Sequence, residues 1–216
     1  MGEWAKKINE KELNKMCAIG RAASKLFNKK GYLETSLKDI STSIKLSKGG
    51  IYHYFSSKHE ILYFILGNYM DLLHGGLEDE LKAIDDPSKK IRYIMLRHLR
   101  LFNKKAPQAR AMLFDARNLP SEYFEAIALK QKKYAAILTS VLSEHFTTAM
   151  SPDELKTISY IFFGICNSIM YWYDPKGAIT LNELSEICYG IFMKGISGFP
   201  GTCEVPFPLD SFIGER

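Results

Sequence analysis

Apolar residues recur at intervals of three and four along almost the whole of this 216-residue chain. That spacing places them on one face of an α-helix, whereas a half-buried β-strand needs strict alternation. Met16, Ile19, Ala23, Leu26 and Phe27 show the helical pattern near the start of the chain. Because no convincing alternating segment occurs, the sequence predicts an all-α fold.

Capping residues, prolines and glycines divide the pattern into about nine helices. Gly31 ends the first predicted helix, which begins near Lys11. The strongest start signal is the segment 151–154, SPDE, with a capping serine, a proline at the first helical position and acidic residues in the first turn. The predicted helices cover about 11–30, 36–44, 48–55, 58–81, 87–105, 107–119, 121–148, 152–171 and 181–197.

Residues 35–61, TSLKDISTSIKLSKGGIYHYFSSKHEI, read as two short helices joined by a tight turn and followed by a third. This is the layout of a helix-turn-helix, whose second helix lies in the DNA major groove. Gly49 and Gly50 would let the backbone of that helix approach the base edges. Lys48 could reach a phosphate or the acceptors of guanine.

Other polar groups flank these residues. Tyr52 and Tyr54 offer hydroxyls to phosphates, while Thr35 and Lys58 stand at helix starts, where free amides attract a phosphate. A tyrosine on a short helix is more often half-buried packing, and Lys48 could simply be solvated. Their joint spacing favours contact with DNA.

The positive charge of the chain gathers in the same region. Residues 1–58 hold 12 Lys or Arg and 5 Asp or Glu, whereas residues 59–216 hold 17 and 19. A solvated basic face without function would give the same count. Its coincidence with the helix-turn-helix pattern indicates a nucleic-acid partner.

Over about residues 13–62 the chain resembles the tetracycline-repressor (TetR) family of transcriptional regulators. The residues that carry the resemblance are Ala22, Ala23, Leu26, Phe27, Gly31, Tyr32, Thr35–Leu37, Asp39, Ile40, Ser47–Gly49, Ile51–Phe55, Ser57 and Lys58. The resemblance implies a cytoplasmic homodimer that binds double-stranded operator DNA, usually as a repressor, and releases it when a small molecule binds. An activator remains an alternative.

The resemblance also implies a division of the chain and a set of DNA contacts. Residues 1–58 would form the DNA-binding domain, residues 59–198 an effector-binding and dimerisation domain, and residues 199–216 an extended tail. The implied DNA-binding residues are Thr35, Ser36, Ser47, Lys48, Gly49, Gly50, Tyr52, His53, Tyr54 and Lys58. The family usually has a glycine where this chain has Lys45, and a left-handed lysine there costs about 1–2 kcal/mol.

The last two predicted helices have broad apolar faces, and in the family this pair forms the dimer interface. The interface residues expected here are Ile158, Ile161, Phe162, Ile165, Ile169, Leu184, Ile187, Ile191 and Phe192. An isologous dimer would hold two recognition helices about 34–36 Å apart and predicts a near-palindromic operator. A monomer core would show the same pattern.

Aromatic residues and methionine are concentrated in the middle of the chain, as a flexible apolar pocket requires, although a plain core is equally rich in them. The expected effector pocket comprises Phe102, Met112, Phe114, Tyr123, Phe124, Tyr134, Phe163 and Asn167. The segment from Asn167 to Leu181 resembles family members that sense fatty acyl-CoA, which implies a similar effector. Arg97, Arg100, Arg110 or Arg117 could meet its phosphates or form surface ion pairs.

Other classes of protein find little support. The chain shows no nucleophile elbow, phosphate loop or metal-ligand spacing, and its five histidines do not cluster in sequence. We therefore expect no enzyme, cofactor or metal site, and the absence of a long apolar run argues against a membrane partner. A helical small-molecule-binding protein, or an enzyme, without DNA binding remains the alternative.

Overall fold

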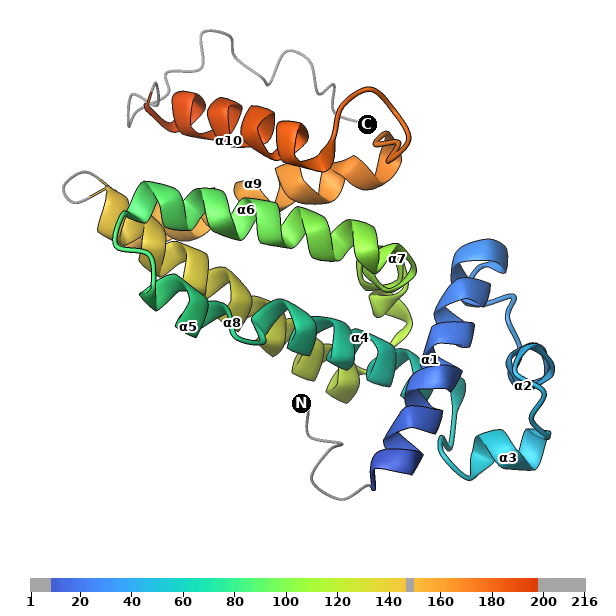
Figure 1. The fold of residues 1–216 in the computed structure, drawn as a ribbon. Coiled ribbons are helices and arrows are strands. Elements are labelled where there is room, and N and C mark those ends of the chain that lie inside the picture. The colour runs from blue at the N-terminus through green and yellow to red at the C-terminus, as the bar shows by residue number, and fades with distance from the viewer. Residues whose placement is uncertain (1–8, 147–149, 198–216) are drawn as a thin grey trace, which may run out of the picture.

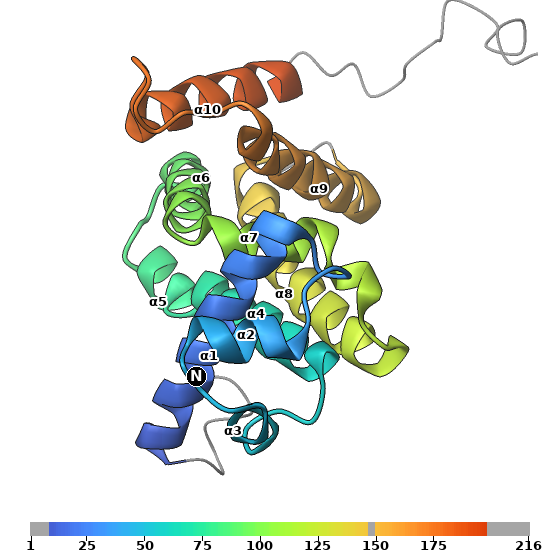
Figure 2. The ribbon, with the colours of Figure 1, turned by 90° about the vertical axis from the view of Figure 1, so that its right-hand side faces the viewer.

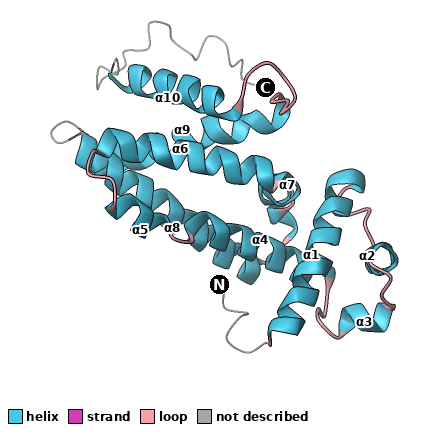
Figure 3. Cartoon of the chain, viewed as in Figure 1, coloured by secondary structure: helices cyan, strands magenta, loops and turns pink. Residues whose placement is uncertain are grey.

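The computed structural model describes residues 9–146 and 150–197. Within these residues every regular element is a helix (Figures 1 and 3), so the all-α prediction is confirmed. The predicted tail 199–216 lies outside the described residues, as does Thr148, where one predicted helix was expected to end. No helix in the described ranges is long and apolar enough to cross a membrane.

The elements follow the predicted order closely. They are α1 (Glu10–Lys30), α2 (Leu37–Ser43), α3 (Lys48–Tyr52), α4 (Lys58–His74), α5 (Leu77–Lys82), α6 (Pro87–Lys104), α7 (Ala106–Phe114), α8 (Ser121–His145), α9 (Pro152–Ser168) and α10 (Leu181–Ser197). Short 3₁₀ turns follow α7 at Ala116–Asn118 (η2) and α9 at Ile169–Tyr171 (η3). We call α1–α3 the head and α4–α10 the body.

The helix predicted over 58–81 is in fact two helices, which corrects the sequence analysis. α4 ends at His74, and Gly76 has a φ of +75°, a left-handed conformation that cannot continue a right-handed helix. The Arg97 guanidinium donates to the carbonyls of Leu73 and Gly75 at 2.5 Å each. These bonds satisfy carbonyls that the end of a helix leaves without partners. Arg97 is therefore used within the protein, where it also lies 2.9 Å from a carboxylate oxygen of Glu80.

Head and body share one hydrophobic core. α1 packs against α4 and α7, and α8 packs against α4, α6 and α9. α10 lies mainly on α6. α9 and α10 stand at the far end of the molecule from α2 and α3 (Figures 1 and 2). Phe27, Ile40, Ile51 and Phe55 are buried where the three head helices meet, and Tyr54 packs against this core.

Candidate functional site

α3 has one buried face and one free face. Ile51 is fully buried, whereas the Tyr52 side chain is 48% exposed and Lys48 is exposed. The Lys48 ammonium lies 5.8 Å from the centroid of the Tyr52 ring, one helical turn away. The Ser47 hydroxyl caps the helix by accepting from the Gly50 amide at 3.0 Å. This short helix is thus held by its inner face and presents a cation and a phenol on its outer face.

The remaining predicted residues of this helix extend the free face. Gly49 and His53 are exposed, and Gly50 and Tyr54 are half-buried. The rings of His53 and Tyr54 are in edge-to-face contact, with their centroids 4.8 Å apart. Tyr54 therefore packs partly against the core, whereas Tyr52 stays at the surface.

The turn between α2 and α3 is left-handed at Lys45, the position where the family usually has a glycine. Lys45 has a φ of +56°, and it is the one non-glycine residue with positive φ in the described ranges. Its amide donates to the Thr42 carbonyl at 3.2 Å, and the Leu46 amide donates to the Ser41 carbonyl at 2.9 Å. The tight turn therefore forms with lysine in the left-handed region.

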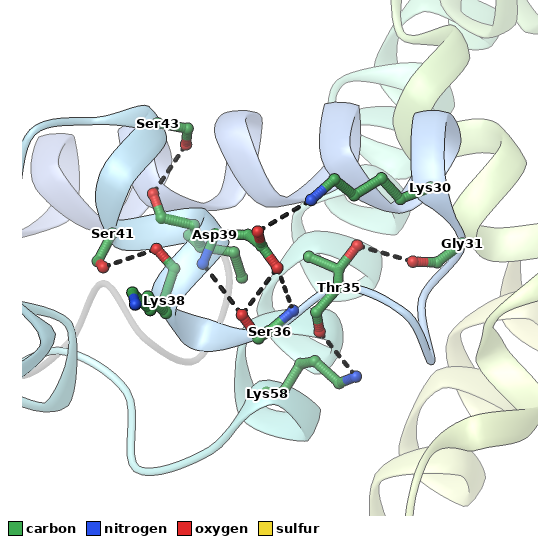
Figure 4. A network of polar contacts seen from close by, with 10 residues as sticks. Lys30, Gly31, Thr35, Ser36, Lys38, Asp39, Ser41, Ser43 and Lys58 are labelled. Atoms are coloured by element: carbon green, nitrogen blue, oxygen red, sulfur yellow. Dashed lines mark hydrogen bonds and ion pairs between the residues drawn. The ribbon is translucent and has the colours of Figure 1, made fainter.

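The start of α2 is fixed by a reciprocal cap (Figure 4). The Ser36 hydroxyl accepts from the Asp39 amide at 3.1 Å, and the Asp39 carboxylate accepts from the Ser36 amide at 2.9 Å. The Lys30 ammonium lies 2.9 Å from the same carboxylate. Together these hydrogen bonds hold the pKa of Asp39 well below its usual range. Ser36 stays exposed, and the first amides of α2 point out of the helix end, where an anion can bind.

Thr35 does not present its side chain to a partner. It is 1% exposed, and its hydroxyl donates to the Gly31 carbonyl at 2.7 Å (Figure 4). The side chain closes the turn between α1 and α2. A role for Thr35 in binding would therefore be indirect, through the position of the α2 amides.

Lys58 is also used inside the protein. Its ammonium donates to the carbonyls of Tyr32, Leu33 and Thr35 at 2.7, 3.2 and 2.9 Å. It lies 4.3 Å from the centroid of the Tyr32 ring, and burial lowers its pKa. The sequence placed this cation on a phosphate, whereas the structure shows it binding the α1–α2 turn to the start of α4. A lone lysine at a helix start gives no signal for such a role.

The body contains a cavity of about 410 Å³ between α4, α6, α7, α8 and α9. Five of the predicted pocket residues line it: Phe102, Met112, Tyr134, Phe163 and Asn167. Three do not. Phe114 contacts Tyr171, Tyr123 stacks on Tyr63 at 4.5 Å, and Phe124 is 45% exposed. Tyr123 and Phe124 lie outside because the cavity begins further along α8, at Ala128.

A buried histidine that the sequence analysis missed stands in the cavity wall. His98 lies between Tyr134 and Asn167, with Nδ1 3.3 Å from the Tyr134 hydroxyl and Nε2 3.2 Å from Asn167 Oδ1. Burial lowers its pKa to about 4, so the ring is neutral at physiological pH. Its place on the apolar face of α6, between Met95 and Phe102 at helical spacing, was the available signal.

The apolar faces of α9 and α10 divide into two parts. Phe162, Ile169, Leu184 and Phe192 are buried in the body, so these four predicted interface residues belong largely to the core of the single chain. The others remain at the surface: Ile158 and Ile165 are half-buried, and Ile161, Ile187 and Ile191 are exposed. A groove of about 500 Å³ between the two helices is lined by four of these isoleucines, Ile158, Ile161, Ile165 and Ile191.

Two family models match the chain. One, described as bacterial regulatory proteins of the tetR family, covers residues 19–63, and the other, described as a tetracyclin repressor-like C-terminal domain, covers residues 85–196. The first match includes α2, α3 and their capping residues. The second includes the groove and the cavity-lining residues of α6 to α9, whereas Tyr69, Met70 and Leu73 of α4 lie between the two matched ranges.

Comparisons with individual proteins point to the same family. The HTH-type transcriptional repressor KstR2 of Mycolicibacterium smegmatis is 21% identical over 182 residues, which are 83% of this chain and 89% of that protein. A TetR-family transcriptional regulator from Bordetella parapertussis superposes with a TM-score of 0.79 at 25% identity, over 88% of this chain and 99% of the other. The structure of AibR in complex with isovaleryl coenzyme A and operator DNA superposes with a TM-score of 0.73 at 24% identity, over 82% and 96%.

Proposed function

Because this chain belongs to the tetR family of bacterial regulatory proteins, and so is a DNA-binding transcriptional regulator and not an enzyme, we propose that it is a repressor that a small apolar effector releases from its operator. The observation that carries the proposal is the geometry of α3. A helix whose inner face is locked by Ile51 and whose outer face offers Lys48 and Tyr52 is suited to the major groove.

The proposed DNA contacts fall into two groups. Ser47, Lys48, Gly49, Gly50, Tyr52, His53 and Tyr54 would meet bases and phosphates directly from α3 and its ends. Ser36 and the first amides of α2 would hold a phosphate, together with Lys38, an exposed lysine of α2 that the sequence analysis did not single out. Thr35 and Lys58 would act by fixing the position of these groups.

We further propose that two copies associate through the isoleucines exposed on α9 and α10. Monomeric proteins rarely leave a row of large apolar side chains in water, and such patches mark interaction sites. Pairing the same face on both copies would set the two α3 helices about one DNA turn, roughly 34–36 Å, apart. A near-palindromic operator would follow from that symmetry, and we propose that the protein acts in the cytoplasm.

For the effector, we propose a CoA thioester of an apolar acyl chain. The cavity has the size and lining of a small-molecule site, largely apolar with a few convergent polar groups. Support comes from the resemblance of the segment 167–181 to acyl-CoA sensors and from AibR, whose structure holds isovaleryl coenzyme A together with operator DNA.

The operator proposal can be tested by selecting bound duplexes from a random 30-base-pair library and sequencing them. We expect two inverted half-sites and an affinity that falls steeply with salt, because phosphate contacts release counterions. Lys48→Ala should weaken binding and reduce the salt slope by about one. Lys82→Ala, which removes an exposed lysine of α5, is the matched control. No enriched sequence, or a salt-independent affinity, would rule the proposal out.

The effector and the sense of regulation need a second experiment. Acyl-CoAs of graded chain length are added to the complex of protein and selected operator, and transcription from a template carrying that operator is followed in parallel. The proposal predicts release of DNA together with increased transcription. Transcription that requires the bound protein would identify an activator, and release by none of the acyl-CoAs would exclude this effector class.

A further inference from the structure

A buried hydroxyl on a tyrosine that lines the cavity has no partner among the described residues. Tyr69, on α4, is 4% exposed and borders the cavity, yet its hydroxyl makes no hydrogen bond within the described residues. Leaving a buried hydroxyl unpaired costs about 1–3 kcal/mol. Burial also raises the pKa of Tyr69, so the phenol keeps its proton and remains a donor. An acceptor placed beside this hydroxyl would satisfy the unpaired donor.

The neighbouring polar groups add a second donor. Asn167 Oδ1 faces His98 Nε2, which therefore carries the proton, and His98 Nδ1 is left to accept from the Tyr134 hydroxyl. With its oxygen occupied, the Asn167 amide nitrogen remains as a donor at the cavity wall. Tyr69 and Tyr134 line the same cavity as Asn167.

The charged groups around the cavity limit the chemical class of ligand that it can bind. Lys132 is the one charged side chain that lines the cavity, and it is exposed, as is the adjacent Gln131. His98 is neutral because burial lowers its pKa to about 4. Arg97, whose charge reaches His98 and Tyr134, is already paired with Glu80. The exposed Lys132 is solvated, so neither cation is free to balance a buried carboxylate. A buried ammonium group would lack an anion, because no carboxylate among the described residues lines the cavity. A ligand that carries an uncharged hydrogen-bond acceptor on an otherwise apolar body avoids both costs.

We propose that Tyr69 and Asn167 donate hydrogen bonds to a carbonyl oxygen of the effector, so that the cavity selects apolar carbonyl compounds over hydrocarbon chains and free carboxylates. The apolar part of the same molecule would lie against Met70, Leu73, Phe102 and Met112. The inference rests on the proposed effector site, and it names the chemical group that this site recognises.

The test compares ligands that differ in the carbonyl alone. Binding of octanoyl-CoA, S-octyl-CoA and octanoate to the full chain is measured by titration calorimetry. S-octyl-CoA carries the same chain and the same CoA on a thioether and has no carbonyl. We expect octanoyl-CoA to bind about tenfold more tightly than S-octyl-CoA, as expected for the loss of a buried hydrogen bond, and octanoate to bind more weakly still.

Two variants assign the effect to Tyr69. Tyr69→Phe should bring the affinities of octanoyl-CoA and S-octyl-CoA to within about twofold without lowering the thermal midpoint, because it removes an unpaired hydroxyl. Tyr160→Phe removes a hydroxyl from another tyrosine that lines the cavity but is 47% exposed, and it should preserve the tenfold ratio.

Equal affinity of the two thioester analogues, absence of binding by both, or an unchanged ratio in Tyr69→Phe would overturn the inference. The regulatory proposal is read separately from operator release. A carbonyl preference without release of DNA would reject the effector role and leave the recognition of the carbonyl standing. If S-octyl-CoA released DNA as effectively as octanoyl-CoA, the effector role would stand and the recognition of the carbonyl would be rejected.

Discussion

The Lys58 ammonium lies 4.3 Å from the centroid of the Tyr32 ring and donates to the Tyr32 carbonyl at 2.7 Å. These two contacts join the first residue of α4 to the turn that follows α1. α4 also lines the cavity of the body through Tyr69 and Leu73. One helix therefore touches the cavity near its C-terminal end and holds the head at its start, so a movement of α4 would carry the α1–α2 turn with it.

The first prediction concerns the stability of this junction. Lys58→Met keeps most of the side chain but loses three hydrogen bonds from a charged donor, so we expect the free energy of unfolding to fall by about 2 kcal/mol. For a chain of this size that corresponds to roughly 4–8 °C in the thermal midpoint. Urea unfolding followed by circular dichroism measures it. Lys48→Met, at an exposed lysine, should leave stability within about 0.5 kcal/mol. Equal stability of both variants would contradict the junction role.

The second prediction concerns Lys45. Its φ of +56° is one that glycine adopts without the steric cost that a Cβ imposes. Lys45→Gly should therefore raise the free energy of unfolding by about 1 kcal/mol. Lys45→Ala removes the long side chain and keeps the Cβ, so it should give no comparable gain. If alanine stabilised as much as glycine in urea unfolding, the backbone explanation would be wrong.

The third prediction concerns pH. The pKa of His98 is about 4 in the folded chain, against 6.5 for an ordinary histidine, because burial disfavours the charged ring, and the Arg97 charge adds to the effect. The unfolded chain therefore binds a proton first as pH falls. The stability from the neutral ring is complete above about pH 6.5 and decreases as pH falls from there toward 4.

Between pH 7 and pH 5 this linkage amounts to about 2 kcal/mol of lost stability. Urea unfolding at both pH values measures the loss. His98→Gln should remove that part of the pH dependence, whereas His53→Gln, at an exposed ring of the head, should keep it. A loss that persists in His98→Gln would assign the effect to other groups.

Local signals in the sequence were sufficient for the helices and for much of the head. Capping serines such as Ser36, Ser47 and Ser151 start helices where the sequence predicts them, because the caps depend on residues three positions apart. The break at Gly75–Gly76 was missed because an apolar period of 3.6 continues across it. Only the left-handed backbone of Gly76 and the distant Arg97 reveal the end of α4.

The sites were harder to predict than the helices, because their contacts join residues far apart in the chain. The Lys58 ammonium meets carbonyls more than 20 positions earlier, and His98 pairs with Tyr134 and Asn167. Periodicity identifies the face of a helix, and it does not say where along the helix a cavity begins. Tyr134 lines the cavity, whereas Phe124, on the same helix, is 45% exposed outside it.

The last prediction concerns the face formed by α9 and α10. Ile161 is 53% exposed beside the groove, so a second copy packed there would bury it. Ile161→Glu would place a charge in that contact without a partner, at a cost of several kcal/mol. We expect the variant to be folded, monomeric by light scattering, and weaker than the parent in operator binding by at least 100-fold, because a single head would then face the DNA alone.

The matched control is Leu129→Glu on α8, whose side chain is 54% exposed and lies away from the groove. It introduces the same charge at a leucine of equal exposure, so it should leave both the mass in solution and the affinity for the operator unchanged. Because the cost arises only if the position is covered by a second chain, the two variants separate association from general surface effects. A dimer that persists in Ile161→Glu, and equally in Ile191→Glu on α10, would place the interface elsewhere on the molecule.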